Sequence, residues 1–591
     1  MARAGPRAQP QALPGNGSRP NTPQPRERVG AGHPGNAARD RDRSSDNEAA
    51  PPASRQPTAP YLTESTMPFS QSDRGGGSFS SQTKTADAAI TGLLPAVRPA
   101  SAETDGALST SAMPAILEVQ GHGPITTYKS ASKEEFNVIS RLAHGPSIRV
   151  LANGLWRQRA SIEALTRQHL GLGSHDSCTV LDRGEWIRGG FNICVVLAIA
   201  SGGRSSKVVF RCAMPYKLAE ARYPGTVDEK LGCEAGAYVW MQERCPDIRI
   251  PHLYGFGYTD GRHFTHVRHR PVLSRISHMF WRCVYRLLKY PLLSQYVRIP
   301  TADHRVSSAY VLLEYIDPAI GRMLPNTWDK HRDDPARQHR LFQGMSKILF
   351  SLARLPQQRI GAFQFNNDGI ITLSNRPLSC SIVLLENDGA PRTMEVNDTY
   401  TCTDAFASDT LTFHDNRFLS QPNAIYTEDD CRAQMAVKTL LRAFAHRHIK
   451  REYRCGPFLL QLTDFHASNM FVDDEWNITC LVDLEWLCAL PPEMLSVPHR
   501  LTGCCVDEIE GELYDEFNKV REHFMRVFRE QESRTKAEHE ITISKLMQDM
   551  WDSKGVWFWY CLSSVNAMYM LLDSHLCPAG YFPSSAERAV S

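Results

Sequence analysis

Three polar side chains that could hold a metal-bound phosphate lie close together within residues 458–490. Asp464 is in a loop, Asn469 follows it by five residues, and Asp483 comes directly after an apolar run. Carboxylate and amide oxygens are the ligands that magnesium takes together with nucleotide phosphates. A carboxylate beside such a metal can also accept the proton of an acceptor hydroxyl. Each residue alone has a structural explanation too, because Asp and Asn in loops commonly form turns and helix caps.

The elements that must position these residues are two short strands. Met470–Val472 and Ile478–Val482 are apolar runs separated by a polar turn, which predicts a tight β-hairpin. That hairpin would place Asn469 and Asp483 near one edge, with Asp464 in the loop just before it. The joint spacing therefore favours a site over three unrelated turn residues.

This segment resembles the catalytic segment of the aminoglycoside phosphotransferase-like proteins of the protein-kinase-like superfamily. The family pattern is HxDxxxxN followed by an Asp at the end of a hydrophobic strand, and Leu462 stands here in place of the His. The longer stretches LQLTDFHASN and WNITCLVDLEW look like a large fungal group of phosphotransferase-domain proteins. The resemblance covers about residues 180–575. It implies an α+β, bilobal protein-kinase-like fold with a small antiparallel N-lobe and a larger, mainly helical C-lobe.

The resemblance also implies ATP and Mg²⁺ as cofactors and a role for each residue of the segment. Asp464 would orient an acceptor hydroxyl and accept its proton, while Asn469 and Asp483 would hold magnesium against the phosphates. Glu485 would assist through the metal shell. The acceptor would be a hydroxyl of a small molecule or metabolite, with amino sugars, choline-like alcohols, sugars and protein hydroxyls all left open.

Upstream of this segment, the sequence predicts three β-strands. They are expected at Thr179–Leu181, Phe191–Ala200 and Lys207–Cys212, with a hairpin turn at residues 201–204. The stretch between the first two strands is DRGEWIRGG. It offers three glycines whose backbone N–H groups could approach a triphosphate, although glycines also suit an ordinary turn. These glycines are Gly184, Gly189 and Gly190.

A basic and an acidic residue follow in the order that the resemblance implies for an ion pair. Arg211 lies on the third strand, where the kinase-like fold carries its phosphate-binding Lys, and a helix follows at about Val227–Glu243. Glu234 lies on the otherwise apolar stripe of that helix. Because a buried carboxylate needs a cationic partner, we expect Arg211 to fill that role. The alternatives are another basic partner or a position at the edge of the stripe.

The next apolar strand is predicted at Tyr310–Ile316. By its position it resembles the hinge between kinase lobes, where the main chain of Leu313, Glu314 and Tyr315 would contact adenine. Before it, Val272–Ile299 interrupts the expected lobe with basic and aromatic residues. We expect an amphipathic helix there that packs its apolar side on the lobe, with a position on a membrane surface as the alternative.

Composition and periodicity divide the chain into four parts. Residues 1–115 are rich in Pro, Gly, Ser, Ala and Arg and poor in aromatic residues, which predicts a disordered tail. A helical lead-in is expected at 116–176, with helical spacing in Ser147–Leu170. An N-lobe at 177–316 would bind nucleotide and carry the basic, aromatic insertion at 265–300. A C-lobe at 317–580 would hold the catalytic segment and the acceptor.

Within the C-lobe, most elements are predicted to be helices. A hairpin turning at residues 367–369 is followed by a long polar stretch to about residue 421, predicted as a lid, an acceptor-side element or a variable surface excursion. Gly555–Leu572 is uncharged and is predicted as a buried core helix rather than a transmembrane span.

Charge and cysteine content exclude several classes of protein. With 66 Lys and Arg against 64 Asp and Glu in 591 residues, a general nucleic-acid binder is not expected. The 16 Cys include no CxxC pair, which favours reduced thiols over zinc or disulfide frameworks. The N-terminal sequence has no apolar h-region, so we expect a cytoplasmic protein, and its Arg-containing, acid-poor opening keeps mitochondrial targeting as an alternative.

Three functions follow from these patterns. The first is an ATP- and Mg²⁺-dependent phosphotransferase. The second is a pseudokinase-like scaffold that binds nucleotide without turnover and contacts a protein partner through its N-terminal tail, which Leu462 and the irregular glycine loop support. The third is a membrane-associated interaction protein that uses the insertion. The joint presence of Asp464, Asn469 and Asp483 favours catalysis, because a scaffold does not need all three.

Overall fold

The computed structural model describes residues 138–300, 306–421, 424–535, 539–565 and 567–577, preceded by Ala131 and two short paired strands. These strands are β1 (Ile116–Leu117) and β2 (Thr126–Thr127). The tail predicted for residues 1–115 lies outside the described residues.

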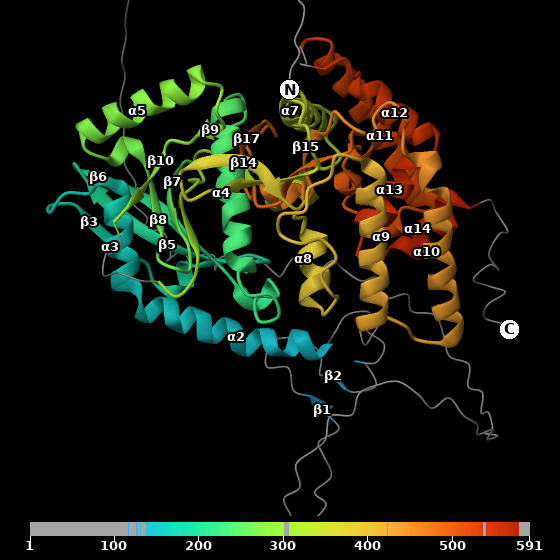
Figure 1. The fold of residues 1–591 in the computed structure, drawn as a ribbon, viewed down its shortest axis with the longest axis horizontal. Coiled ribbons are helices and arrows are strands. Elements are labelled where there is room, and N and C mark those ends of the chain that lie inside the picture. The colour runs from blue at the N-terminus through green and yellow to red at the C-terminus, as the bar shows by residue number, and fades with distance from the viewer. Residues whose placement is uncertain are drawn as a thin grey trace, which may run out of the picture. The chain divides into compact units, whose positions relative to one another are not determined.

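The N-terminal region is built on an antiparallel sheet with the strand order β10-β8-β7-β11-β6-β5-β3, and β4 pairs with β5 (Figure 1). The predicted hairpin between β5 and β6 is confirmed: Ser201 pairs with Arg204, and both turn glycines have positive φ, 56° and 75°. Two consecutive positive φ values match the right-handed twist of the flanking strands. The strands are β3 (Ser177–Val180), β4 (Ile187–Arg188), β5 (Asn192–Ser201), β6 (Arg204–Ala213), β7 (Leu253–Gly257), β8 (His263–His266), β10 (Tyr296–Ile299) and β11 (Tyr310–Glu314).

The two faces of this sheet pack into two different hydrophobic cores. On β11, Tyr310 and Leu312 pack with α3 (Arg159–Leu170), whereas Val311 and Leu313 pack with α4 (Thr226–Arg244). This division follows from the alternation of side chains along a strand. The helix expected within residues 147–170 is observed as two helices, α2 (Val138–Arg157) and α3.

The C-terminal region combines two small antiparallel sheets with most of the helices, as expected for an α+β fold. One sheet has the order β12-β16-β17 and the other β15-β18-β13-β14-β9. The strands are β9 (Leu292–Leu293), β12 (Arg322–Met323), β13 (Gly361–Phe365), β14 (Ile370–Asn375), β15 (Leu459–Leu462), β16 (Met470–Val472), β17 (Ile478–Leu481) and β18 (Leu487–Leu490). The helices are α6 (Pro325–His331), α7 (Pro335–Ala353), α8 (Cys380–Asn387), α9 (Thr403–Ser420), α10 (Glu428–His448), α11 (Gly511–Glu532), α12 (Ile543–Asp552), α13 (Gly555–Ser563) and α14 (Met568–Leu571).

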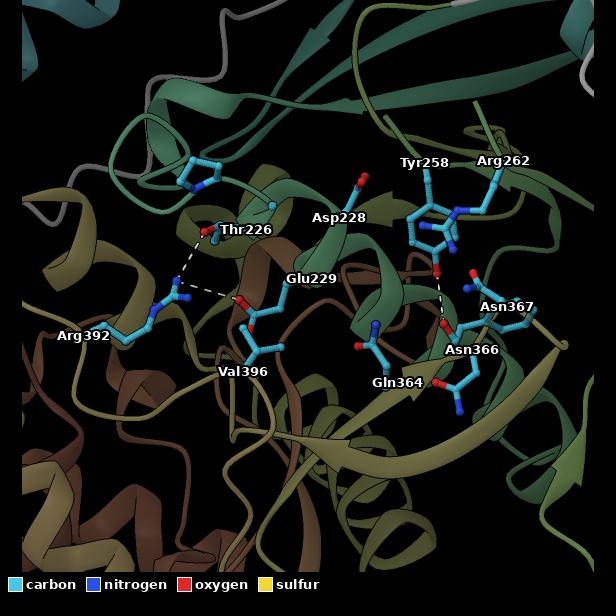
Figure 2. Close-up of a pocket in the computed structure, with 13 residues that line it drawn as sticks. Thr226, Asp228, Glu229, Tyr258, Arg262, Gln364, Asn366, Asn367, Arg392 and Val396 are labelled. Carbon is cyan, nitrogen blue, oxygen red and sulfur yellow. Dashed lines mark hydrogen bonds and ion pairs between the residues drawn. The ribbon is translucent and has the colours of Figure 1, made fainter. Parts of the chain in front are cut away.

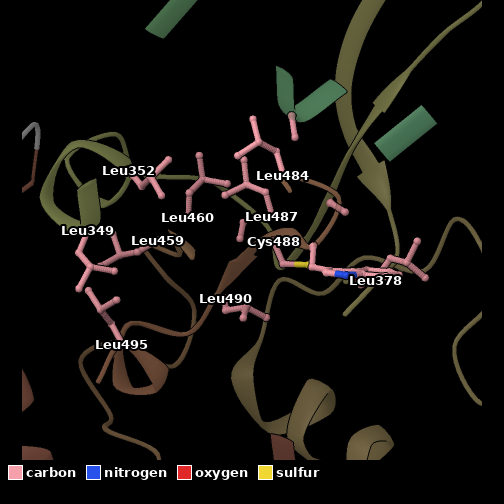
Figure 3. Packing of buried hydrophobic residues seen from close by; sticks show 14 of the residues in the cluster. Leu349, Leu352, Leu378, Leu459, Leu460, Leu484, Leu487, Cys488, Leu490 and Leu495 are labelled. Atoms are coloured by element: carbon pink, nitrogen blue, oxygen red, sulfur yellow. The ribbon is translucent and has the colours of Figure 1, made fainter. Parts of the chain in front are cut away.

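The predicted hairpin within residues 458–490 is confirmed as β16 and β17, with Met470 opposite Leu481 and Phe471 opposite Cys480. Leucines of β15, β18 and α7 pack beneath the segment, which anchors its loops to the core (Figure 3). Helix α4 reaches the same region through a close contact with β13. A Cβ at Gly236 would lie 3.0 Å from Cβ of Phe363, so a larger residue at this position would have to push β13 away, and glycine favours the close approach.

Two expectations for the C-terminal region are corrected. The polar stretch predicted after the hairpin that turns at residues 367–369 is not irregular throughout, because it contains α8 and α9. Its Arg376 is fully buried between Glu229 and Glu386, and burying an arginine requires such partners. Gly555–Leu572 is also not a single helix but contains α13 and α14. No helix within the described residues is long and apolar enough to cross a membrane.

The largest correction concerns the insertion, which forms α5 (Val272–Leu287), β9 and β10. Strand β10 completes the N-terminal sheet through pairing with β8, so only part of the segment is an insertion. The expected packing of the apolar side of α5 on the lobe is wrong: α5 has no buried residue. Its polar side makes the contacts to the protein instead, through His278 and Arg282.

Candidate active site

A buried cluster of charges lies where the N-terminal sheet, α4 and the turn after β17 meet. Arg211 lies on β6, and its side chain contacts three carboxylates that arrive from two other elements. Nη1 of Arg211 is 2.6 Å from Oε1 of Glu234 on α4. Nη2 is 2.5 Å from Oδ1 of Asp483 and 2.9 Å from Oε2 of Glu485, both in the turn after β17. The ion pair expected between Arg211 and Glu234 is thus present.

Lys230 is a second cation in this cluster, and the sequence reasoning missed it. Its Nζ is 3.3 Å from Glu234 and 3.1 Å from Oδ1 of Asn192, and it also forms an ion pair with Glu485. The signal was available, because Lys230 precedes Glu234 by one helical turn and so shares its face of α4. Asn192, at the start of β5, also donates to Glu485 at 2.9 Å.

The electrostatics of the cluster favour the charged forms of both bases. Burial opposes a positive charge on Arg211 and Lys230, but the surrounding carboxylates outweigh burial and raise the pKa of each. The two cations face three carboxylates, those of Glu234, Asp483 and Glu485. A buried cluster with one carboxylate more than it has cations attracts a further positive charge.

Asp483 is the most accessible member of this cluster. Its side chain is 30% exposed, compared with 9% for Arg211 and 1% for Glu485. Its φ is +64°, a left-handed conformation that side chains other than glycine rarely adopt. Such strain is typical of functional sites and is maintained by the surrounding packing. Asp483 therefore presents a carboxylate to the outside of the cluster while Glu485 stays enclosed.

Asn469 lies beside Asp483 because the hairpin closes between them. The backbone N–H of Val482 donates to the carbonyl of Asn469 at 2.9 Å. The side-chain Nδ2 of Asn469 donates to the carbonyl of Asp464 at 2.9 Å. No described residue donates a hydrogen bond to Oδ1 of Asn469. This oxygen could therefore act as a metal ligand.

Asp464 is oriented by a residue that the sequence reasoning also missed. Nδ1 of His466 accepts a hydrogen bond from the backbone N–H of Ser468 at 3.2 Å, so a neutral His466 carries its proton on Nε2. That Nε2 lies 3.4 Å from Oδ2 of Asp464. Burial alone would raise the pKa of Asp464, but the contact with His466 and the charge of Arg500 lower it below its usual value. Asp464 is therefore ionised at neutral pH.

The glycine segment has one part near the cluster and one part away from it. The N–H of Gly189 donates to the carbonyl of Asn192, and Gly190 follows directly, so this pair lies next to a residue of the cluster. The turn that contains Gly184 is held elsewhere, because Arg183 donates to Asn153 on α2 at 2.7 Å. Gly189 and Gly190 thus lie next to Asn192 along the chain, whereas Gly184 lies in a turn against α2.

Of the three predicted hinge residues, only Tyr315 lies beyond the end of its strand. Leu313 and Glu314 belong to β11, which is flanked by β6 and β7. The N–H of Glu314 donates to the carbonyl of His252, and its carboxylate is 2.7 Å from Arg249. The main chain of this strand is therefore engaged within the sheet, and the chain leaves the sheet only after Glu314.

A cavity of about 390 Å³ lies on another face of α4, lined by Asp228 and Glu229 rather than by Lys230 and Glu234. Figure 2 shows Arg392 reaching Thr226 and Glu229 at one end, and Tyr258 with Arg262 at the other. This cavity does not include the charged cluster, and none of the site residues predicted from the sequence lines it.

Comparisons with known proteins were made for both sequence and structure. No family model and no curated protein matches the sequence. The structure is similar to a thermostable mutant of the aminoglycoside phosphotransferase APH(4)-Ia in complex with AMP-PNP and hygromycin B, at 12% identity and a TM-score of 0.33, covering 70% of this chain and 95% of that chain.

Two further solved structures are similar. One is Plasmodium vivax ethanolamine kinase, at 11% identity and a TM-score of 0.28, covering 69% of this chain and 79% of that chain. The other is a putative fructosamine-3-kinase from Haemophilus somnus 129PT, at 11% identity and a TM-score of 0.29, covering 72% of this chain and 99% of that chain. These are similarities of fold, to aminoglycoside phosphotransferases and related small-molecule kinases.

Proposed function

We propose that this protein is an ATP- and magnesium-dependent phosphotransferase that acts on a hydroxyl of a small molecule. The observation that carries the proposal is the meeting of Asp464, Asn469 and Asp483 beside a buried cluster with two cations. Phosphoryl transfer needs mainly positioning and charge neutralisation, and these residues can supply both.

The residues at the site fit a magnesium ion. The free Oδ1 of Asn469 and the exposed carboxylate of Asp483 are hard oxygen ligands, and the cluster has an excess of negative charge. Bound magnesium would neutralise charge on the phosphates. We assign only Asn469 and Asp483 to the metal. Glu485 is enclosed by Lys230, Arg211 and Asn192 and serves to hold the two cations in place.

The other residues have roles that follow from their contacts. Arg211 is anchored by Glu234 and Glu485 and would bind a phosphate of the nucleotide, while Gly189 and Gly190 would cover the phosphates. Adenine would meet the main chain from Tyr315 onward, after the end of β11. Asp464, ionised and oriented by His466, would accept a hydrogen bond from the acceptor hydroxyl and then its proton.

A thermal-shift titration tests nucleotide binding. ATP with magnesium should raise the melting temperature of the wild type, and ATP with a chelator should raise it less. The variant Asp483→Ala should lose the magnesium-dependent part. If magnesium makes no difference in the wild type, the proposal is refuted.

One observation favours a second function, a nucleotide-binding scaffold without turnover. Arg211 is 2.5 Å from Asp483, so the carboxylate assigned to the metal is engaged in an ion pair. Two assays separate these functions: a coupled-enzyme assay of ATP hydrolysis, and a test for phosphorylation of a panel of hydroxyl-bearing metabolites. A magnesium-dependent thermal shift with neither hydrolysis nor phosphorylated product would support the scaffold.

A further inference from the structure

Helix α5 turns its apolar face away from the protein. None of its 16 residues is buried. Seven of its large apolar side chains are between 53% and 82% exposed, and they recur at helical spacing, so they form one continuous stripe. The residues of this stripe, the α5 stripe below, are Val272, Leu273, Ile276, Met279, Phe280, Trp281 and Leu287.

The orientation of α5 is set by polar contacts on its opposite side. Nε2 of His278 donates to the carbonyl of Ser294 at 2.7 Å. One turn later, Arg282 donates from Nε to the carbonyl of Leu293 at 3.0 Å and from Nη2 to Glu243 at 2.5 Å. At about 100° per residue, His278 and Arg282 point away from Leu273 and Phe280. The helix therefore cannot turn its stripe inward without breaking these contacts.

The surroundings of the stripe are strongly basic. Residues 261–300 contain eight Arg and Lys and neither Asp nor Glu. Arg275 and Arg286 lie on α5 along one edge of the stripe, and Lys289 follows its end. No ion pair of these three side chains is found within the described part of the chain. Figure 1 shows α5 at the periphery of the N-terminal region, and α5 contacts β9.

We propose that α5 is a docking surface for the anionic face of a lipid bilayer. The helix would lie in the plane of the interface with the α5 stripe among the acyl chains, while Arg275, Arg286 and Lys289 meet lipid phosphates. Trp281 lies at the border of the stripe, and tryptophan is enriched at this depth of a membrane. An anionic bilayer would thus both cover the apolar stripe and neutralise these three basic side chains.

A second copy of the chain fits this surface less well. A helix of 16 residues is about 24 Å long and roughly 10 Å wide, so its face offers only a few hundred Å², against about 800 Å² per partner in a stable interface. Two copies would also bring their arginines together. A bilayer has no such minimum area, because single amphipathic helices bind to it.

Vesicle co-sedimentation of the full chain tests the proposal. The wild type should bind vesicles of phosphatidylcholine and phosphatidylserine in equal parts, and bind phosphatidylcholine alone more weakly. The double variant Leu273→Glu/Phe280→Glu should lose affinity by at least about tenfold, because each change places a charge in the apolar layer. Arg275→Glu/Arg286→Glu should lose the preference for phosphatidylserine. The matched control is Leu419→Glu, since Leu419 is 80% exposed on α9, away from α5.

Either of two kinds of result would overturn the proposal. One is a failure of the vesicle predictions, in which the wild type stays in the supernatant with both vesicle types or the Leu273→Glu/Phe280→Glu variant binds as the wild type does. The other is a dimer in sedimentation velocity that this variant dissociates, because a second copy would then cover the stripe. Since the substituted side chains are exposed, the thermal unfolding of each variant should match that of the wild type.

Discussion

Neutralising either of two carboxylates that are only two residues apart should affect different properties of the protein. Asp483 is 30% exposed and contacts Arg211 alone within the cluster. Glu485 is 1% exposed and contacts Arg211, Lys230 and Asn192. We predict that Asp483→Asn removes magnesium-dependent nucleotide binding and leaves the fold nearly as stable, whereas Glu485→Gln destabilises the fold itself.

The magnitudes follow from burial. Removing one partner of a buried charge network costs about 3 to 5 kcal/mol, and Glu485→Gln leaves Lys230 and Arg211 short of a carboxylate. A partly exposed pair such as Asp483 with Arg211 contributes only about 0 to 1 kcal/mol. Ligand binding adds a separate effect, since a ligand at a hundred times its Kd stabilises a protein by about 2.7 kcal/mol.

Urea unfolding followed by tryptophan fluorescence, with and without ATP and magnesium, separates these effects. Without ligand, Asp483→Asn should unfold close to the wild type and Glu485→Gln at a clearly lower urea concentration. With ligand, only the wild type should gain the full stabilisation. A Glu485→Gln variant as stable as the wild type would refute the anchoring role of Glu485, and an Asp483→Asn variant with a full magnesium response would refute the metal assignment.

Two further predictions concern stability. Arg376 is fully buried with bidentate contacts to Glu229 and Glu386, so Arg376→Met should cost about 3 to 5 kcal/mol and lower the urea midpoint, whereas an unchanged midpoint would contradict this. Burial, with the charges of neighbouring groups, lowers the pKa of His169 and His266 to about 3 from an ordinary 6.5. Because the unfolded chain takes up these protons first, their stability contribution is present above pH 6.5. It should be lost as the pH falls towards 3, by up to about 1.4 kcal/mol per pH unit for each histidine, and a urea midpoint that is flat between pH 7 and 4 would contradict this.

Local pattern was enough to predict the elements that carry the site. The alternation of apolar residues indicated β5 and β6, and the glycine pair at 202–203 indicated their turn, because strand and turn preferences act over a few residues. The hairpin of β16 and β17 was recognisable for the same reason. The buried position of Glu234 could be inferred because it interrupts an apolar stripe.

Features that depend on distant partners could not be predicted in this way. Glu485 looked like a metal ligand by its spacing from Asp483, but its environment comes from residues 274 and 293 positions away in the sequence, Arg211 and Asn192. Helix α5 has an amphipathic pattern that normally indicates an apolar face turned inward. Which face turns inward was decided by the contacts of His278 and Arg282.

The sequence by itself thus determined which groups this protein has available for chemistry and in what order along the chain they come. The tertiary structure alone decided which of them share a charge network, since that depends on distances across the junction of β6, α4 and the turn after β17. It showed Lys230 and His466 as members of the site and separated an exposed carboxylate, Asp483, from an enclosed one, Glu485. The physical reason is that periodicity reports which face of an element is apolar, whereas electrostatic roles depend on burial and on partners that only folding brings together.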